Sequence, residues 1–287
     1  DDSLRVKKNV GWKLNGTVVV INSAWRLIKD GHGDGRLNMA TDRAILTACD
    51  RGQAPATLRL YGWDKPTLSI GYSQNELRDV NKEQCEQRNI PIVRRFTGGR
   101  ALLHQHEFTY SLVAPIPHPG IPDNLAGAFC AVSKAVILSL EKAGVTNPEM
   151  VGKEKRTAGM SRKRSPACFS ASNHWEISVK GKKLAGSAQR RLNGAFLQHG
   201  SILLDKDYEL THSLFRYFSA TEKNRGLKEL ISNTITLNEV LPVNLGWKIL
   251  THYFVEGFQE TFPASWQPGF LTSFENELVK NYLEESE

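Results

Sequence analysis

Two alternating segments joined by a tight turn constrain the fold more than any other feature of the sequence. Trp175, Ile177 and Val179 are separated by single residues, residues 180–182 (Lys-Gly-Lys) can form a hairpin turn, and residues 183–189 return along the first segment. A period of two, with a glycine in the turn, is typical of paired antiparallel strands. The chain is therefore expected to contain an antiparallel sheet.

The same periodicities and turn residues predict further elements. Helices are predicted over residues 37–50, after Asn81 (a capping box with Gln84), over 124–143 between an Asn124 N-cap and a Gly144 terminator, and over most of the chain from 205 to Tyr282. Strands are predicted at residues 57–61, 67–70, 90–96, 101–104, 108–113 and 197–204. Hairpins with helices between them indicate an α/β (α+β) fold, a mixed, largely antiparallel sheet flanked by helices.

Length and composition fit one globular domain. The chain has 287 residues, of which 40% are hydrophobic and 23% charged, and no break in composition marks a second domain. No apolar run approaches the about 18 residues that a membrane-spanning helix needs. The apolar run Val18 to Ile21 has no small-residue cleavage site, so no secretion signal is predicted and a cytoplasmic location is expected. We expect residues 25–287 to form the domain and residues 1–24 to be an N-terminal extension, a tag or an extra segment.

The four cysteines, Cys49, Cys85, Cys130 and Cys168, lie far apart in the sequence. None of the spacings matches a zinc or C-x₂-C redox site. Free cysteines are mostly small buried hydrophobic residues, and this is the expectation for three of the four.

The formal net charge of +7 indicates an acidic partner. Charge alone does not decide whether this partner is a nucleic acid or an acidic protein. Residues 147–166 form a predicted basic loop with little hydrophobic periodicity. No helix-turn-helix, zinc-finger spacing or aromatic RNA-binding motif is found, which argues against a nucleic-acid-binding module.

Three segments carry possible chemistry. Residues 94–100 (Arg-Arg-Phe-Thr-Gly-Gly-Arg), followed by His104, could bring backbone close to a ligand or form a plain turn. Lys183, followed by small residues, could hold a cation over an acyl carbonyl or be a solvated lysine beside a hairpin. Cys168, 15 residues before Lys183, could be a nucleophile whose thiolate a nearby ammonium favours, or a buried structural thiol.

Several motifs together resemble those of the lipoate-protein ligase, biotin ligase and octanoyltransferase superfamily. The resemblance rests on residues 95–104 (Arg-Phe-Thr-Gly-Gly-Arg-Ala-Leu-Leu-His), on residues 61–63 leading to 71–74 (Gly-Tyr-Ser-Gln), and on residues 183–189 (Lys-Leu-Ala-Gly-Ser-Ala-Gln) continuing to 198–204. The motifs occur in the order of that superfamily, from about Trp25 to the C-terminus.

Within the superfamily, Cys168 indicates the branch. Ala167-Cys168-Phe169 is similar to the octanoyltransferases of the LipM type, which carry a cysteine at this position and form a thioester on it. ATP-dependent lipoate ligases instead activate a free acid as an acyl-adenylate and need no cysteine there. Arg100, directly after the two glycines, also resembles the octanoyltransferase branch.

The resemblance implies that octanoyl passes from the phosphopantetheine thiol of acyl carrier protein to Cys168, and then to a lysine of a lipoyl domain. The acceptor would be the glycine-cleavage H protein or a 2-oxoacid dehydrogenase E2, and neither ATP, a metal nor another cofactor is expected. Lys183 would polarise the carbonyl and favour the thiolate. The acyl- and substrate-binding residues that the resemblance implies are Gly71, Arg95, Gly98, Gly99, Arg100, His104, Ala185, Gly186, Ser187, Gln189, His199 and Gly200.

The basic loop could guide the acidic partners that the resemblance implies, or be an ordinary solvated loop. The residues concerned are Lys153, Lys155, Arg156, Arg162, Lys163 and Arg164. We expect a monomer that binds neither nucleic acid nor membrane. Two other activities stay open: an amidotransferase that moves octanoyl between lipoyl-bearing proteins, and an ATP-dependent lipoate ligase.

Overall fold

A computed structural model describes residues 11–14, 17–20, 24–151 and 176–285. The main sheet has eight strands in the order β13–β3–β4–β8–β12–β11–β10–β9. The β13–β3 and β3–β4 pairs are parallel and the remaining neighbours are antiparallel, which confirms the prediction of a mixed, largely antiparallel sheet. The strands are β3 (Ala24–Gly33), β4 (Thr57–Trp63), β8 (Glu107–Pro115), β9 (Glu149–Val151), β10 (Glu176–Val179), β11 (Lys182–Arg191), β12 (Ala195–Leu203) and β13 (Ser265–Pro268).

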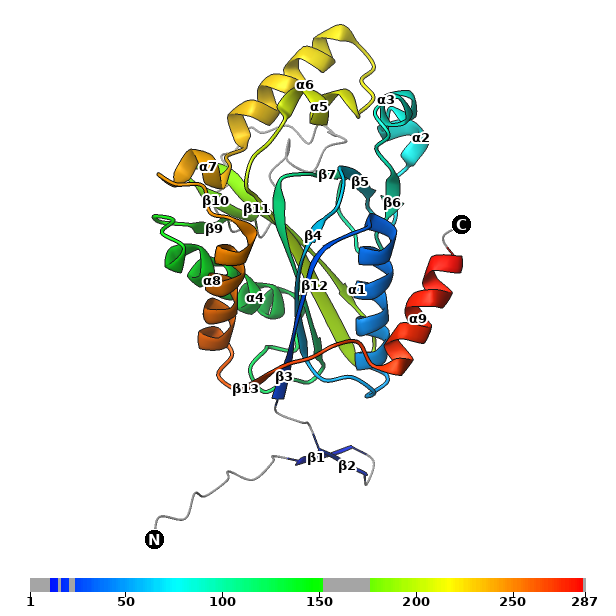
Figure 1. The fold of residues 1–287 in the computed structure, drawn as a ribbon, viewed down its shortest axis with the longest axis vertical. Helices are drawn as coiled ribbons and strands as arrows, with labels where there is room; N and C mark the ends of the chain where they lie inside the picture. The colour runs from blue at the N-terminus through cyan, green and yellow to red at the C-terminus, as the bar shows by residue number, and fades with distance from the viewer. Residues whose placement is uncertain (1–10, 15–16, 21–23, 152–175, 286–287) are drawn as a thin grey trace.

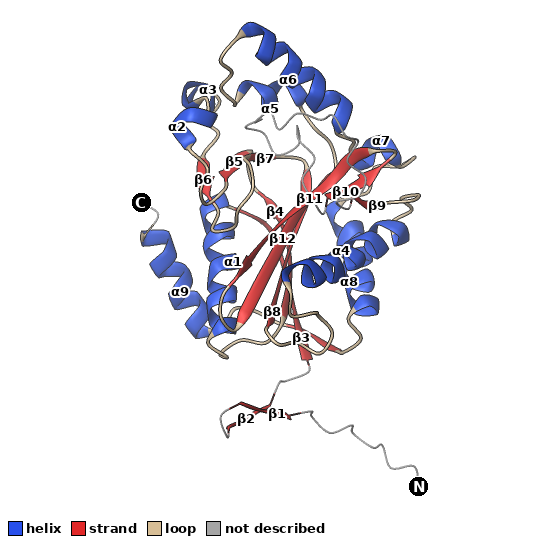
Figure 2. Cartoon of the chain, turned by 180° about the vertical axis from the view of Figure 1, so that it is seen from behind, coloured by secondary structure: helices blue, strands red, loops and turns tan. Residues whose placement is uncertain are grey.

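Helices cover both faces of this sheet (Figures 1 and 2). α4 (Leu125–Lys142) and α8 (Trp247–Thr261) lie on one face, and α1 (Gly35–Asp50) and α9 (Ser273–Glu284) lie on the other. The largest apolar cluster packs the strands against α4 and α8, with Phe108, Tyr110, Phe254 and Phe258 fully buried. The predicted caps of α4 are confirmed, because the Asn124 side chain accepts a hydrogen bond from the amide of Gly127 and Gly144 has a φ of 95°.

The predicted β10–β11 hairpin is also present. Lys180 and Gly181 have φ angles of 52° and 74°, and Val179 pairs with Lys182 across the turn. Two consecutive positive φ angles match the twist of the strands that such a turn joins. Lys182 thus already belongs to β11, and Trp175 lies outside the described residues.

A second sheet of three strands lies above the main sheet in Figure 1, in the order β6–β5–β7. Its strands are β5 (Thr67–Ile70), β6 (Ile92–Arg94) and β7 (Leu102–His104), and α2 (Glu76–Asp79), α3 (Lys82–Gln87), α5 (Tyr208–Ser213), α6 (Ala220–Asn233) and α7 (Leu237–Val240) surround this end of the molecule. β6 and β7 both pair with β5 and not with each other. The segment between them, residues 95–101, therefore passes over the end of β5 instead of forming a plain hairpin turn. Because it contains the two glycines at 98–99, we call it the glycine crossing.

Some expected details differ. Asn81 does cap α3, because its side chain accepts a hydrogen bond from the amide of Gln84. The side chain of Gln84, however, bonds Gln87 and not the backbone of Asn81, as it would in a capping box. β3 and β13 were not predicted, and they pair with each other. β1 (Gly11–Leu14) and β2 (Thr17–Val20) form a separate two-stranded sheet, and the proposed boundary after residue 24 stays a prediction. Among the described helices, none has the length and apolar character to cross a membrane.

Candidate active site

A cavity of about 70 Å³ lies between the two sheets. Its walls come from α1, from the ends of β4, β5, β7 and β8, from the glycine crossing, from the first residue of β10, and from β11 and β12. The lining residues are Met39, Tyr61, Trp63, Ser69, Arg95, Gly99, Leu102, His104, Thr109, Glu176, Lys183, Gly186, Ser187, Ala188, His199, Gly200 and Ser201. The structure thus brings both glycine- and lysine-containing motifs of the sequence to one place.

Lys183 is buried in this cavity, with a relative exposure of 6%. Its Nζ donates to Oε1 of Glu176 at 2.7 Å, and the side chain of Glu176 is equally buried. A Cβ on Gly186 would lie 3.0 Å from Cε and 3.1 Å from Nζ of Lys183. The glycine therefore leaves room for the ammonium along the strand. The interpretation of Lys183 as a solvated lysine is wrong.

Glycines let two backbone segments meet at the edge of the cavity. A Cβ on Gly71 would lie 2.1 Å from the carbonyl oxygen of Gly99, and Gly99 itself has a φ of 101°. On the opposite side, a Cβ on Gly200 would lie 2.5 Å from Oγ of Ser187 and 2.9 Å from the carbonyl oxygen of Gly186. Any larger residue at Gly71 or Gly200 would displace backbone, so both glycines determine the shape of the cavity.

Arg95 holds the glycine crossing in place. Its guanidinium donates to the carbonyl oxygens of Gly98 and Arg100 at 3.1 and 2.7 Å, and to Oγ of Ser69 on β5 at 2.9 Å. Arg95 is 6% exposed and reaches the cavity wall as well. Its observed contacts make it a support of the loop, while its predicted contact with a substrate stays a prediction.

His104 is the centre of one buried hydrogen-bond network. Its Nδ1 and Nε2 lie 2.7 Å from Oε1 of Glu107 and 2.7 Å from Oγ of Ser69, and its ring stacks on Trp63 with centroids 3.8 Å apart. The same carboxylate oxygen of Glu107 also accepts from Thr109. Burial lowers the pKa of His104, although the neighbouring carboxylate opposes the shift. The imidazole is thus neutral near pH 7, with both nitrogens engaged.

His199 belongs to a second network. Its Nδ1 lies 3.1 Å from Oδ2 of Asp42 on α1, and its Nε2 lies 2.8 Å from Oγ1 of Thr97 in the glycine crossing. Arg59 and Tyr61 also bond Asp42. Burial raises the pKa of Asp42, but the hydrogen bond from His199 and the charge of Arg59 outweigh it, so the pKa lies below its usual value. Asp42 is therefore a fixed anion that ties α1 to the crossing through His199.

Five predicted site residues do not line the cavity: Gly71, Gly98, Arg100, Ala185 and Gln189. Ala185 is buried in the main apolar cluster, and the side chain of Gln189 donates to Gln198 along the sheet. Gly98 and Arg100 lie in the crossing and offer their carbonyl oxygens to Arg95. Gly71 contributes indirectly, through its close approach to Gly99.

Glu176, Glu107 and Asp42 belong to the site but were not predicted. Glu176 could have been found from the hairpin, because the two-residue turn pairs Ser178 with Lys183 and places Glu176 diagonally opposite that lysine. Glu107 reaches the site through the pairing of β8 with β4 and β12, and Asp42 reaches it because α1 packs against His199 of β12 and Arg59 of β4; no local pattern reveals either contact.

Cys168 and the six basic residues from Lys153 to Arg164 lie outside the described residues. Of the other cysteines, Cys49 and Cys85 are buried and Cys130 is half-buried, as expected of structural thiols. In the part of the chain that the structure describes, no group of His, Cys, Asp and Glu side chains could hold a metal ion.

Comparisons with known proteins agree with this geometry. Residues 34–259 match the family model described as the lipoyl protein ligase A/B catalytic domain. The octanoyltransferase LipM of Kyrpidia tusciae is 38% identical over 90% of this chain and 94% of its own length. The octanoyltransferase LipM of Bacillus subtilis is 34% identical over 91% of this chain and 94% of its own.

Solved structures show the same fold. A bipartite lipoate protein ligase of Thermoplasma acidophilum superposes with a TM-score of 0.73 and 20% identity, over 91% of this chain and 92% of its own. A lipoate-protein ligase A with bound ATP gives a TM-score of 0.71 and 20% identity, over 91% of this chain and 94% of its own. The fold and the extent of the sequence match lead to one conclusion: this chain belongs to the lipoyl protein ligase A/B catalytic-domain family, in the branch that contains the LipM octanoyltransferases.

Proposed function

We propose that this enzyme is an acyltransferase that moves an octanoyl group to the lysine of a lipoyl-bearing protein during lipoate biosynthesis. The observation that carries the proposal is the buried Lys183 ammonium in a cavity walled by Trp63, Met39 and glycine backbone. Such a cavity, with a volume of about 70 Å³, can admit the carbonyl of an acyl group and place a positive charge beside its oxygen. The named activity of relatives that are 34–38% identical supports the same function.

In the proposed first step, the thiolate of Cys168 attacks the carbonyl carbon of octanoyl-acyl carrier protein. A new thioester bond forms to Cys168, the bond to the phosphopantetheine sulfur breaks, and the carrier leaves as a thiolate that takes a proton. Lys183 stabilises the negative oxygen of the tetrahedral intermediate. One thioester replaces another, so the exchange is nearly isoenergetic.

In the second step, the neutral amine of the acceptor lysine attacks the acyl-Cys168 carbonyl. An amide bond forms, the bond to the Cys168 sulfur breaks, and the proton lost by the amine balances the released thiolate. Because an amide is more stable than a thioester, the step needs no ATP and no metal. The acceptor is the glycine-cleavage H protein or a 2-oxoacid dehydrogenase E2, and the enzyme works as a monomer in the cytoplasm.

The experiment is to incubate the full chain with octanoyl-acyl carrier protein without ATP and to measure its intact mass. We expect an octanoyl adduct that hydroxylamine removes and that Cys168→Ser does not form, whereas the matched Cys130→Ser variant still forms it. An acylation of the lipoyl domain that depends on ATP would refute the mechanism. If octanoyl-lipoyl protein acylates Cys168 and octanoyl-acyl carrier protein does not, the enzyme is an amidotransferase.

A further inference from the structure

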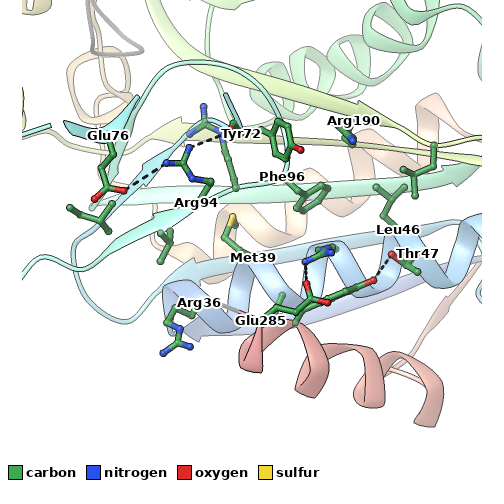
Figure 3. Close-up of a pocket in the computed structure, with 17 residues that line it drawn as sticks. Arg36, Met39, Leu46, Thr47, Tyr72, Glu76, Arg94, Phe96, Arg190 and Glu285 are labelled. Carbon is green, nitrogen blue, oxygen red and sulfur yellow. Dashed lines mark hydrogen bonds and ion pairs between the residues drawn. The ribbon is translucent and has the colours of Figure 1, made fainter. Parts of the chain in front are cut away.

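A groove of about 700 Å³ runs along the outer face of α1. Figure 3 shows Met39 and Leu46 of α1 forming one wall and Tyr72, Arg94 and Phe96 forming the other. The end of α9 closes one side through Tyr282 and Glu285, and the end of β11 contributes Arg190 and Leu192. The groove is thus a surface site built from elements that are distant in sequence.

The groove adjoins the active-site cavity. Met39 and Arg95 line both, and each is less than 8% exposed, so they form the boundary between the two spaces. Ala188 of β11 lines the cavity, and Arg190, two residues further along the same strand, lines the groove. The groove and the cavity that holds Lys183 are therefore direct neighbours.

The groove carries an excess of positive charge. Its lining includes five arginines and two glutamates: Arg36, Arg43, Arg94, Arg95 and Arg190, with Glu76 and Glu285. Arginine binds phosphate through paired, charge-assisted hydrogen bonds, and several arginines in one groove are typical of phosphate recognition.

One of these arginines already holds an anion. Nη1 of Arg43 lies 2.7 Å from Oε2 of Glu285, and its guanidinium lies 3.7 Å from the centroid of the Tyr282 ring. The side chains of Arg43 and Glu285 are 42% and 56% exposed, and exposed ion pairs of this kind contribute little to stability. A phosphate, which has more charge and more acceptor oxygens than a carboxylate, can therefore displace Glu285 from Arg43.

Arg190 is the second arginine of interest. It is exposed, its guanidinium lies 5.3 Å from the centroid of the Tyr72 ring, and Tyr72 is 60% exposed. In the part of the chain that the structure describes, Arg190 forms no ion pair. Its charge is thus available to a ligand.

We propose that this groove binds the phosphopantetheine arm of the acyl donor, with the phosphate at Arg43 and Arg190 and the thioester end directed toward the cavity. This inference rests on the proposed function, because the donor of that reaction carries such an arm. An acceptor lysine has no phosphate, so the arginines fit the donor better than the acceptor. Met39, Leu46 and Phe96 provide the apolar surface along which the pantetheine chain lies.

The test is calorimetric binding of 4′-phosphopantetheine and of pantetheine, which lacks the phosphate, to the full chain. We expect the phosphorylated probe to bind about tenfold tighter, the effect of one charged hydrogen bond, and this preference to fall in Arg43→Gln and in Arg190→Gln. Glu285→Gln should strengthen binding of phosphopantetheine and leave pantetheine unchanged, because it frees Arg43. Arg225→Gln on α6, an exposed arginine paired with Glu229, serves as the matched control.

Equal binding of the two probes, or a phosphate preference that survives both arginine variants, would overturn the proposal. The acylation of Cys168 by octanoyl-acyl carrier protein and by octanoyl-coenzyme A is measured in parallel. If neither donor acylates Cys168 while the arginine-dependent preference holds, the groove stands and the proposed acyl transfer fails. If Arg43→Gln slows only the coenzyme A donor, the assignment to a carrier-protein arm is wrong.

Discussion

Replacing Glu176 by Gln tests how the active-site cation is held. The 2.7 Å ion pair with Lys183 joins two side chains that are each 6% exposed, so water screens it weakly. Removing one member of a buried pair leaves its partner's charge poorly compensated, which costs about 3–5 kcal/mol. Because Lys183 makes further contacts, we expect the lower end, about 3 kcal/mol of unfolding free energy.

The assay is urea denaturation at pH 7, with Glu229→Gln as the matched control. Glu229 pairs with Arg225 at 3.5 Å, and both side chains are more than 40% exposed, so the control should lose less than about 1 kcal/mol. Glu176→Asp keeps the charge and should recover part of the stability. We also expect Glu176→Gln to lower kcat more than it raises KM, because Lys183 is then less well oriented for the intermediate.

If Glu176→Gln lost no more unfolding free energy than Glu229→Gln, the result would refute this reasoning. It would mean that the Glu176–Lys183 pair is solvated in the working enzyme. A stable Glu176→Gln variant with normal kcat would also show that Lys183 needs no help from Glu176.

Lys183→Ala should fold and lose activity, because the cation that stabilises the intermediate is removed; full activity would exclude the catalytic role. Gly71→Ala should be destabilised by at least about 2 kcal/mol in urea, since its Cβ would lie 2.1 Å from the carbonyl oxygen of Gly99, and unchanged stability would contradict that approach. The pKa of Asp42 is lowered in the folded protein. Its ionised carboxylate therefore contributes to folding stability above the pKa of about 4 that it has in the unfolded chain, and this contribution is lost as the pH falls through its pKa in the folded protein. In Asp42→Asn, the unfolding free energy should thus fall less steeply between about pH 5 and 2 than in the unmodified protein. An unchanged slope would contradict the lowered pKa of Asp42. Burial raises the pKa of Cys49 to about 12, so this thiol should resist a thiol reagent at pH 8 until urea unfolds the chain, and rapid reaction in the native state would be inconsistent with its burial.

Local patterns predicted most elements near the site. The 124–143 helix appears as Leu125–Lys142 with its predicted caps, and the β10–β11 hairpin has the expected turn. β3 and β13 escaped prediction because both lie at one edge of the sheet and carry polar residues such as Arg26, which is buried and forms an ion pair with Glu275 of α9. Burial of an arginine by a glutamate so distant in sequence cannot be read from periodicity.

The strands at 57–63 and 67–70 show a related limit. Their polar and apolar residues alternate, which is typical of a sheet with one face in water, yet every residue of both strands is buried. The polar face of Thr57 to Trp63 meets α1, where Arg59 and Tyr61 bond Asp42, and Ser69 meets His104 and Arg95. A second buried polar layer between sheet and helix replaces the expected solvent.

The sequence by itself determined the hairpin at 176–189, the helix caps, and the presence of glycines and a lysine in the order of the family, because these depend on neighbours a few residues apart. Only the tertiary structure decided that Lys183 is a buried cation held by Glu176, that Arg95 supports the glycine crossing, and that the crossing passes over β5. These depend on contacts between strands distant in the chain. Burial makes these contacts important for stability, because a charged side chain that is removed from water needs an oppositely charged or hydrogen-bonding partner inside the protein.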